Sequence, residues 1–153
     1  MSRRALLSVL AFALSQNLLG CADWLKTKDP EVDVQTGVFF GGQLQRRSKW
    51  ALILDTTRQT QGFRVLFKHA LGEPSLIAWE VTRLQMDSKR RVQQVTTQNQ
   101  TTLPAGTTQN DQLIPFEQMD RPGSWRLKVR LLNRSVYAGT LEIVPSSAMP
   151  QED

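Results

Sequence analysis

The stretch "RPGSWRLKVRLL" (residues 121–132), followed by "VYAGTLEIV" (136–144), decides the fold class of this chain. In the first segment apolar residues alternate strictly with cations. The apolar residues are Trp125, Leu127, Val129 and Leu131, and the cations are Arg126, Lys128 and Arg130. Because side chains alternate between the two faces of a strand, this pattern places the apolar residues on a buried face and the cations on a solvent-exposed face. In the second segment Tyr137, Leu141 and Ile143 share a face, with an interruption at Gly139. The two segments, joined by the turn "NRS" (133–135), therefore predict an antiparallel hairpin with one buried face.

Further strand patterns precede this hairpin. They are "KWALIL" (49–54), "GFRVLFKH" (62–69), "SLIAWEVTRL" (75–84) and the weaker "RRVQQVTT" (90–97). Residues 97–112 are rich in Thr, Gln and Asn and offer few apolar groups, which predicts a long exposed loop, with edge-strand pairing as the alternative. About seven short strands without an amphipathic helix pattern predict an all-β fold, a single antiparallel β-sandwich over residues 37–145.

The N-terminus has the three parts of a secretory signal. Arg3 and Arg4 are followed by the uncharged apolar run "ALLSVLAFAL" and then by "SQNLLGC", a short segment in the position of the cleavage region. The apolar run is shorter than the roughly 20 residues that cross a bilayer. Residues 1–20 are therefore predicted to be a signal peptide.

Cys21 is the only cysteine in the 153 residues, so no intramolecular disulfide can form. The sequence Leu18-Leu19-Gly20-Cys21 resembles the bacterial lipobox, although Leu19 is larger than usual at its position. The resemblance implies that the Cys21 thiol carries a diacylglycerol and becomes the first residue of the mature chain, anchored to the membrane by covalent lipid. Residues 21–36 would then be the lipidated N-terminus and a flexible tether, and residues 146–153 a polar tail.

The segment 113–144 is similar to the closing hairpin of small extracytoplasmic immunoglobulin-like modules of bacteria. The similarity rests on an aromatic residue, a Pro-Gly turn, a Trp and alternating apolar residues, here Phe116, Pro122, Gly123, Trp125, Leu127, Val129, Leu141, Ile143 and Val144. It covers about a fifth of the chain closely. It implies a fold and leaves the function open, because such sandwiches host many unrelated roles.

Charge argues against a nucleic-acid partner. Arg3 and Arg4 lie in the signal peptide, so the formal net charge falls from +5 for the whole chain to +3 after cleavage. That excess is smaller than a dedicated nucleic-acid binder shows. Its most concentrated part is Arg126, Lys128 and Arg130 on one strand face, with Arg134 in the following turn, which is a candidate binding face for anionic lipid, an anionic polymer or an acidic protein. A solvated face that discourages aggregation is the simpler alternative.

Catalytic and metal motifs are missing from the sequence. His69, the one histidine, ends a strand without a nucleophile motif nearby, and the three methionines after the signal are widely separated (Met86, Met119 and Met149), which argues against copper. The carboxylates are scattered, mostly in turns, where Asp is common (Asp55, Glu73, Glu80, Asp87, Asp111, Glu117 and Asp120). The sequence thus predicts no enzyme activity and no cofactor.

The sequence therefore predicts a lipid-anchored lipoprotein at the extracytoplasmic face of the cell membrane. It would serve as a non-catalytic binding or assembly module of the envelope, with an envelope protein or an anionic polymer as partner. Two alternatives remain: a lipid-anchored hydrolase of an envelope polymer, which needs carboxylates or His69 converging in a cleft, and a carrier, which needs an apolar cavity.

Overall fold

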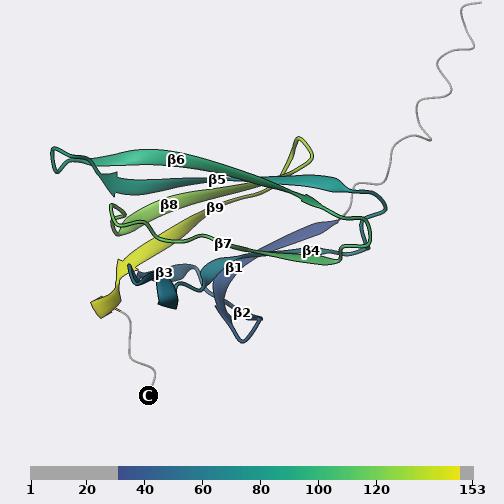
Figure 1. Cartoon of the computed structure of the whole chain (residues 1–153), viewed down its shortest axis with the longest axis horizontal. Helices are drawn as coiled ribbons and strands as arrows, with labels where there is room; N and C mark the ends of the chain where they lie inside the picture. Colours follow the sequence, from purple (N-terminus) through teal and green to yellow (C-terminus); the bar gives the residue numbers. More distant parts are fainter. Residues whose placement is uncertain (1–30, 149–153) are drawn as a thin grey trace, which may run out of the picture.

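A computed structural model describes residues 31–148, which form two packed β-sheets (Figure 1). The four-stranded sheet has the order β2-β1-β4-β7, with bounds Gln43–Arg46, Val32–Phe40, Gln61–Phe67 and Gln109–Leu113. The five-stranded sheet has the order β3-β9-β8-β5-β6, with bounds Lys49–Leu52, Arg134–Pro145, Gly123–Leu131, Ser75–Met86 and Val92–Leu103. Two short 3-10 helices, Thr56–Arg58 and Ser146–Ala148, complete the described part. No helix within it is long and apolar enough to span a membrane.

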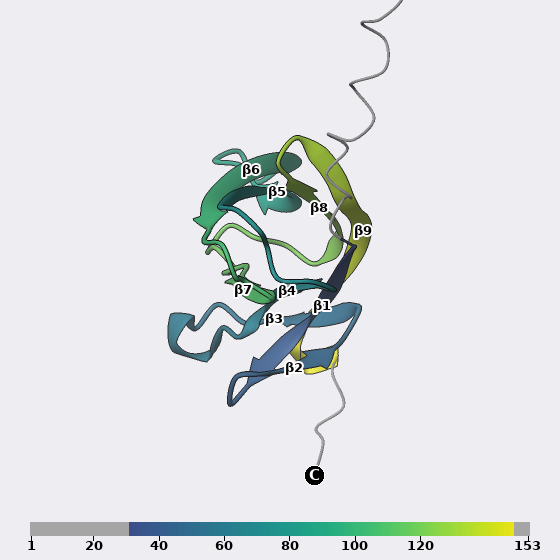
Figure 2. The same cartoon turned by 90° about the vertical axis from the view of Figure 1, so that its right-hand side faces the viewer.

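The predicted all-β sandwich is confirmed, with two differences in detail. Nine strands form where about seven were expected, partly because β1 and β2 make a hairpin through Gly41 and Gly42, whose positive φ angles of 53° and 78° suit glycine. One strand pair is parallel, because β3 lies alongside β9 with Lys49 opposite Glu142. The chain thus passes from the four-stranded sheet at β2 to the edge of the five-stranded sheet at β3 (Figure 2).

The core is built from the strand faces that the alternation marks as apolar. Trp125, Leu127, Val129 and Leu131 on β8 are buried, as are Leu141 and Ile143 on β9. Ile77, Trp79 and Val81 on β5, in the same sheet, are buried too, and so are Phe63, Val65 and Phe67 on β4 in the facing sheet. Strand periodicity alone thus fixes which side of each sheet faces the interior.

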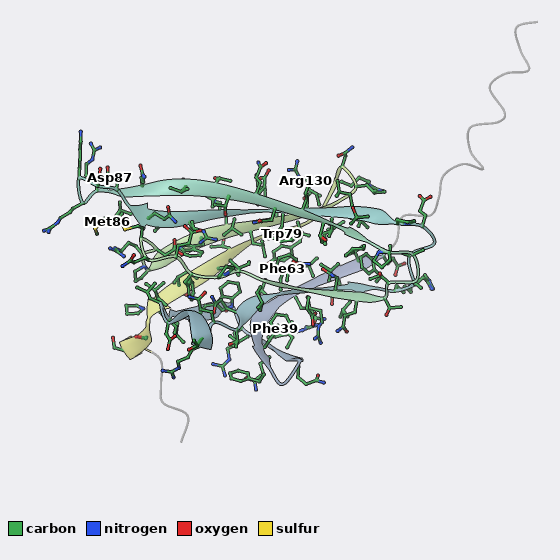
Figure 3. All side chains as sticks on the ribbon, viewed as in Figure 1. Phe39, Phe63, Trp79, Met86, Asp87 and Arg130 are labelled. Atoms are coloured by element: carbon green, nitrogen blue, oxygen red, sulfur yellow. The ribbon has the colours of Figure 1, made fainter. Side chains whose placement is uncertain are left out.

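Aromatic contacts occupy the centre of the core. Phe63 on β4 meets Trp79 on β5 edge to face, with ring centroids 5.7 Å apart, so this pair joins the two sheets (Figure 3). Phe116 and Trp125 make a second edge-to-face pair at 5.5 Å. Such pairs contribute about 0.5–1.5 kcal/mol beyond their burial, in a sandwich whose described residues contain no cysteine.

Two segments differ from the sequence-based expectation. β1 begins at Val32, so residues 32–36 belong to a strand and not to the predicted tether. Residues 97–112 are not a long loop: they hold the second half of β6, a turn and most of β7. β6 pairs with β5 from Val92 opposite Met86 to Leu103 opposite Ser75, so backbone hydrogen bonding holds a strand whose side chains bury little.

A buried charged cluster fixes the connection between β7 and β8. Asp120 is fully buried, and its carboxylate accepts hydrogen bonds from Arg83 Nη1 at 3.1 Å, Gln85 Nε2 at 3.0 Å and the Glu117 backbone N–H at 2.7 Å. The guanidinium of Arg83 also donates to Glu117 at 3.1 Å and lies 5.1 Å from the Trp125 ring. The cluster therefore ties this connection to β5 before the chain enters β8.

Candidate functional site

The predicted basic residues lie on the outer face of the five-stranded sheet. The alternation of β8 points Arg126, Lys128 and Arg130 to solvent while their neighbours fill the core. Arg126 is opposite Thr82 on β5 and Thr140 on β9, and Lys128 is opposite Glu80 and Ala138. The cations thus form a row along the middle of a face that also carries the carboxylates Glu80 and Glu142 among smaller and uncharged side chains.

One member of this row is neutralised locally. Arg130 Nη2 donates to Glu80 Oε1 at 2.8 Å, and Gln98 on β6 donates to the same oxygen at 3.0 Å. Among residues 31–148, neither Arg126 nor Lys128 makes a side-chain hydrogen bond or ion pair. The outer face therefore offers two exposed positive charges to a partner (Figure 3 labels the adjacent Arg130).

The outer face of the four-stranded sheet is different, because its central cation is already engaged. Arg64 forms a bidentate ion pair with Asp111, at 2.6 Å from Nε to Oδ1 and 2.8 Å from Nη2 to Oδ2. It also donates to the Gly42 carbonyl at 2.9 Å and lies 5.6 Å from the Phe39 ring centroid. The hydrogen bond to Asp111 raises the pKa of Arg64 above its ordinary value. In the part of the chain that the structure describes, the central cation of this face is therefore neutralised.

Strand β6 borders the basic face and leaves one backbone edge open. It is twelve residues long and carries no charged residue, and within residues 31–148 its only strand neighbour is β5. Edge strands usually carry charge, proline or a cover that prevents further pairing. β6 therefore offers a run of unpaired N–H and C=O groups to a partner strand.

An apolar corner at one end of this face was not predicted from the sequence. Leu132, in the turn between β8 and β9, is 53% exposed and has a φ of +48°, which is unfavourable for a residue with a side chain. Its N–H donates to the Leu76 carbonyl at 2.7 Å, and Leu76 is exposed as well. The residue type gives no warning of this backbone conformation, so the corner could not be found from the sequence.

The remaining predicted site residues are separate from this face or outside the described range. Arg134 begins β9 at the hairpin turn, opposite Leu131, and has an interaction partner of its own. Cys21 lies outside the described residues, as do the signal peptide and residues 22–30.

Catalytic groups do not gather in a cleft of the described part. Glu117 and Asp120 come together, but Arg83 and Gln85 engage them and Asp120 is buried. His69 is exposed beyond the end of β4. Residues 31–148 contain no group of three His, Cys, Asp or Glu side chains placed to hold a metal ion.

Comparison with known proteins gives a structural likeness. No protein-family model matches the sequence, and no curated protein matches it either. The structure is similar to an immunoglobulin-like protein from Pseudomonas aeruginosa, with a TM-score of 0.51 and 17% identity over 76% of this chain and 99% of that one. The structure also aligns with an alkylpurine DNA glycosylase from Pseudomonas fluorescens, solved with DNA, over 74% of this chain and 30% of that one. The identity is 13% and the TM-score 0.35, so this alignment does not show a shared fold. The first likeness shows the fold alone: residues 31–148 form an immunoglobulin-like β-sandwich.

Proposed function

We propose that this protein is a lipid-anchored, non-catalytic binding module of the bacterial cell envelope. The lipobox-like sequence at Cys21 supports an anchor on the extracytoplasmic side of the membrane. The immunoglobulin-like sandwich supports a binding role, and its outer face supplies the candidate surface.

The observation that carries the binding role is the combination on the outer face of the five-stranded sheet. Arg126 and Lys128 project from β8 without ion-pair partners among the described residues, and the open edge of β6 borders the same face. Charge supplies orientation and association rate, whereas an edge strand supplies backbone hydrogen bonds in a fixed register. A protein with an acidic surface and an extended segment meets both requirements, whereas an anionic polysaccharide meets only the first.

The anchor is tested by intact mass and membrane partition of the wild type and the Cys21→Ser variant in a bacterial host. We expect a lipid-sized mass gain on Cys21 and membrane association that the variant loses. An uncut, unmodified N-terminus would overturn the lipoprotein proposal, and a clean cut without lipid would make the protein secreted.

The binding face is tested by crosslinking in intact cells. The double variant Arg126→Gln/Lys128→Gln is compared with Lys68→Gln, a control that removes one exposed cation, paired with Glu31, beside the ends of β1 and β4. We expect a specific protein adduct that the double variant loses and the control keeps. An adduct that both variants keep would reject this face, and retention by isolated wall polymer in place of a protein adduct would reject the protein partner.

A further inference from the structure

A groove lies where the chain passes from one sheet to the other, on the opposite edge of the sandwich from β6. Its walls come from the end of β1, from β3, and from the connection between β3 and β4, and its volume is about 320 Å³. That volume is at the lower end of the range of pockets that bind small molecules. The basic row of β8 takes no part in it.

The lining of the groove is largely apolar, from Val38, Phe40, Trp50, Ala51 and Ile53. Trp50 is only 1% exposed, and its indole Nε1 has no hydrogen-bond acceptor among the described residues. A buried donor without an acceptor is costly, so the fold accepts this cost at one wall of the groove.

Cations surround this apolar lining. Arg47, Lys49 and Arg58 all line the groove. Lys49 Nζ is 3.5 Å from Glu142, in a pair whose two side chains are both more than half exposed, so it remains available to a ligand. The Arg58 guanidinium makes no hydrogen bond or ion pair within residues 31–148. Its nearest carboxylate in sequence, Asp55, accepts hydrogen bonds from the hydroxyl and N–H of Thr57, which lower the pKa of Asp55, and the charge of Arg58 lowers it further.

We infer that this groove binds a small amphipathic anion, with an apolar body and one carboxylate, sulfonate or phosphate head. The apolar body would lie against Phe40, Trp50 and Ile53, and the head would accept hydrogen bonds from Arg58 and Lys49. Charge complementarity selects the anion, because no acidic side chain lines the groove. The inference is independent of the proposed function, since the two surfaces share no residue.

The test uses the full chain with Cys21→Ser and para-trifluoromethylbenzoate as the probe, observed by fluorine NMR. The amide of the same compound serves as the uncharged control. We expect saturable broadening of the benzoate signal and binding of the amide that is about tenfold weaker, the difference a charge-assisted hydrogen bond provides.

Three variants locate the binding. Arg58→Gln, in an exposed connection, should weaken benzoate binding about tenfold, whereas Arg126→Gln removes the same charge from β8 and should leave it unchanged. Trp50→Phe keeps an aromatic wall and leaves both cations in place, so it should change benzoate and amide binding alike and by less than Arg58→Gln changes benzoate binding.

Equal binding of benzoate and amide, or equal effects of Arg58→Gln and Arg126→Gln, would overturn the inference. So would the absence of saturable binding. Size-exclusion chromatography of the same samples tests a second copy as occupant: a dimer that Arg58→Gln dissociates would also overturn it.

Discussion

Removal of the Asp120 carboxylate should destabilise this protein strongly, although Asp120 lies in a connection and not in a strand. In Asp120→Ala, Arg83 loses its fully buried partner, and its own side chain is only 5% exposed. Breaking a buried ion pair in this way costs about 3–5 kcal/mol. Arg83 keeps Glu117 at 3.1 Å and the Pro115 carbonyl at 3.2 Å, which places the expected loss at the lower end, about 3 kcal/mol.

The assay is urea unfolding followed by tryptophan fluorescence, which reports on Trp125 beside Arg83. All proteins carry Cys21→Ser and are measured in the same detergent. With a slope of about 1.5 kcal/mol per molar, the midpoint should fall by about 2 M urea. Asp111→Ala, which breaks the partly exposed pair with Arg64, is the control and should cost less than about 1 kcal/mol.

A double variant tests the reason for the loss. Arg83→Met/Asp120→Ala removes both charges, so no buried guanidinium is left uncompensated. It should be more stable than Asp120→Ala alone by at least about 1 kcal/mol. Additive losses in the double variant, or a loss below about 1 kcal/mol in Asp120→Ala, would refute the assignment of this stability to the buried pair.

Three further outcomes follow from single positions. Gly62→Ala should lower the unfolding free energy by at least about 2 kcal/mol. The alanine Cβ would lie 2.1 Å from the Gln112 backbone oxygen, so the β4–β7 pairing must shift. An unchanged midpoint in urea unfolding would contradict this. Leu132→Gly should raise the unfolding free energy by about 0.5–1 kcal/mol, because glycine adopts a φ of +48° without strain. A lower urea midpoint would contradict this, since it would mean that the leucine side chain stabilises the fold by more than the strained φ angle destabilises it. The Asp87 carboxyl should titrate below its ordinary value of 3.8 in carbon-detected NMR, because the Arg91 N–H and then the Arg91 side chain and the Lys89 N–H donate to it. Because folding lowers this pKa, the ionised carboxylate stabilises the folded β5–β6 turn above pH 3.8, and this stabilisation is lost as the pH falls through the pKa of the folded state. Protection of the turn amides from hydrogen exchange should therefore persist at pH 4 and decrease at lower pH.

The sequence predicts the parts of the fold where apolar residues alternate with polar ones. Trp125, Leu127 and Val129 are fully buried and the intervening cations are exposed, because a strand that covers a core has no other arrangement. The same rule indicates only the first half of β6, as the weaker pattern over residues 90–97, and leaves its second half as either a loop or an edge strand, because the Thr, Gln and Asn side chains bury little. That strand is held by backbone pairing with β5, to which side-chain hydrophobicity gives no clue.

Residues that meet across long distances in sequence were the harder part of the site. Arg83 continues the inward alternation of Ile77, Trp79 and Val81, and nothing local indicates that Asp120 will neutralise it inside the core. The pairing of Arg130 with Glu80 likewise depends on strand register. The groove beside Trp50 combines residues from three segments, so it exists only once both sheets have formed.

The parallel pairing of β3 with β9 also has a consequence for the order in which the chain can fold. Lys49 and Glu142 are about 90 residues apart in sequence, and β9 lies between β3 and β8, so the larger sheet is incomplete until β9 is available to pair. Chain synthesis runs from the N-terminus, and contacts of such high sequence separation form late. A chain emerging from a ribosome would therefore leave the larger sheet incomplete until β9 has been made. Until then β3 has no neighbour in that sheet and β8 is paired with β5 alone, so two strand edges stay open.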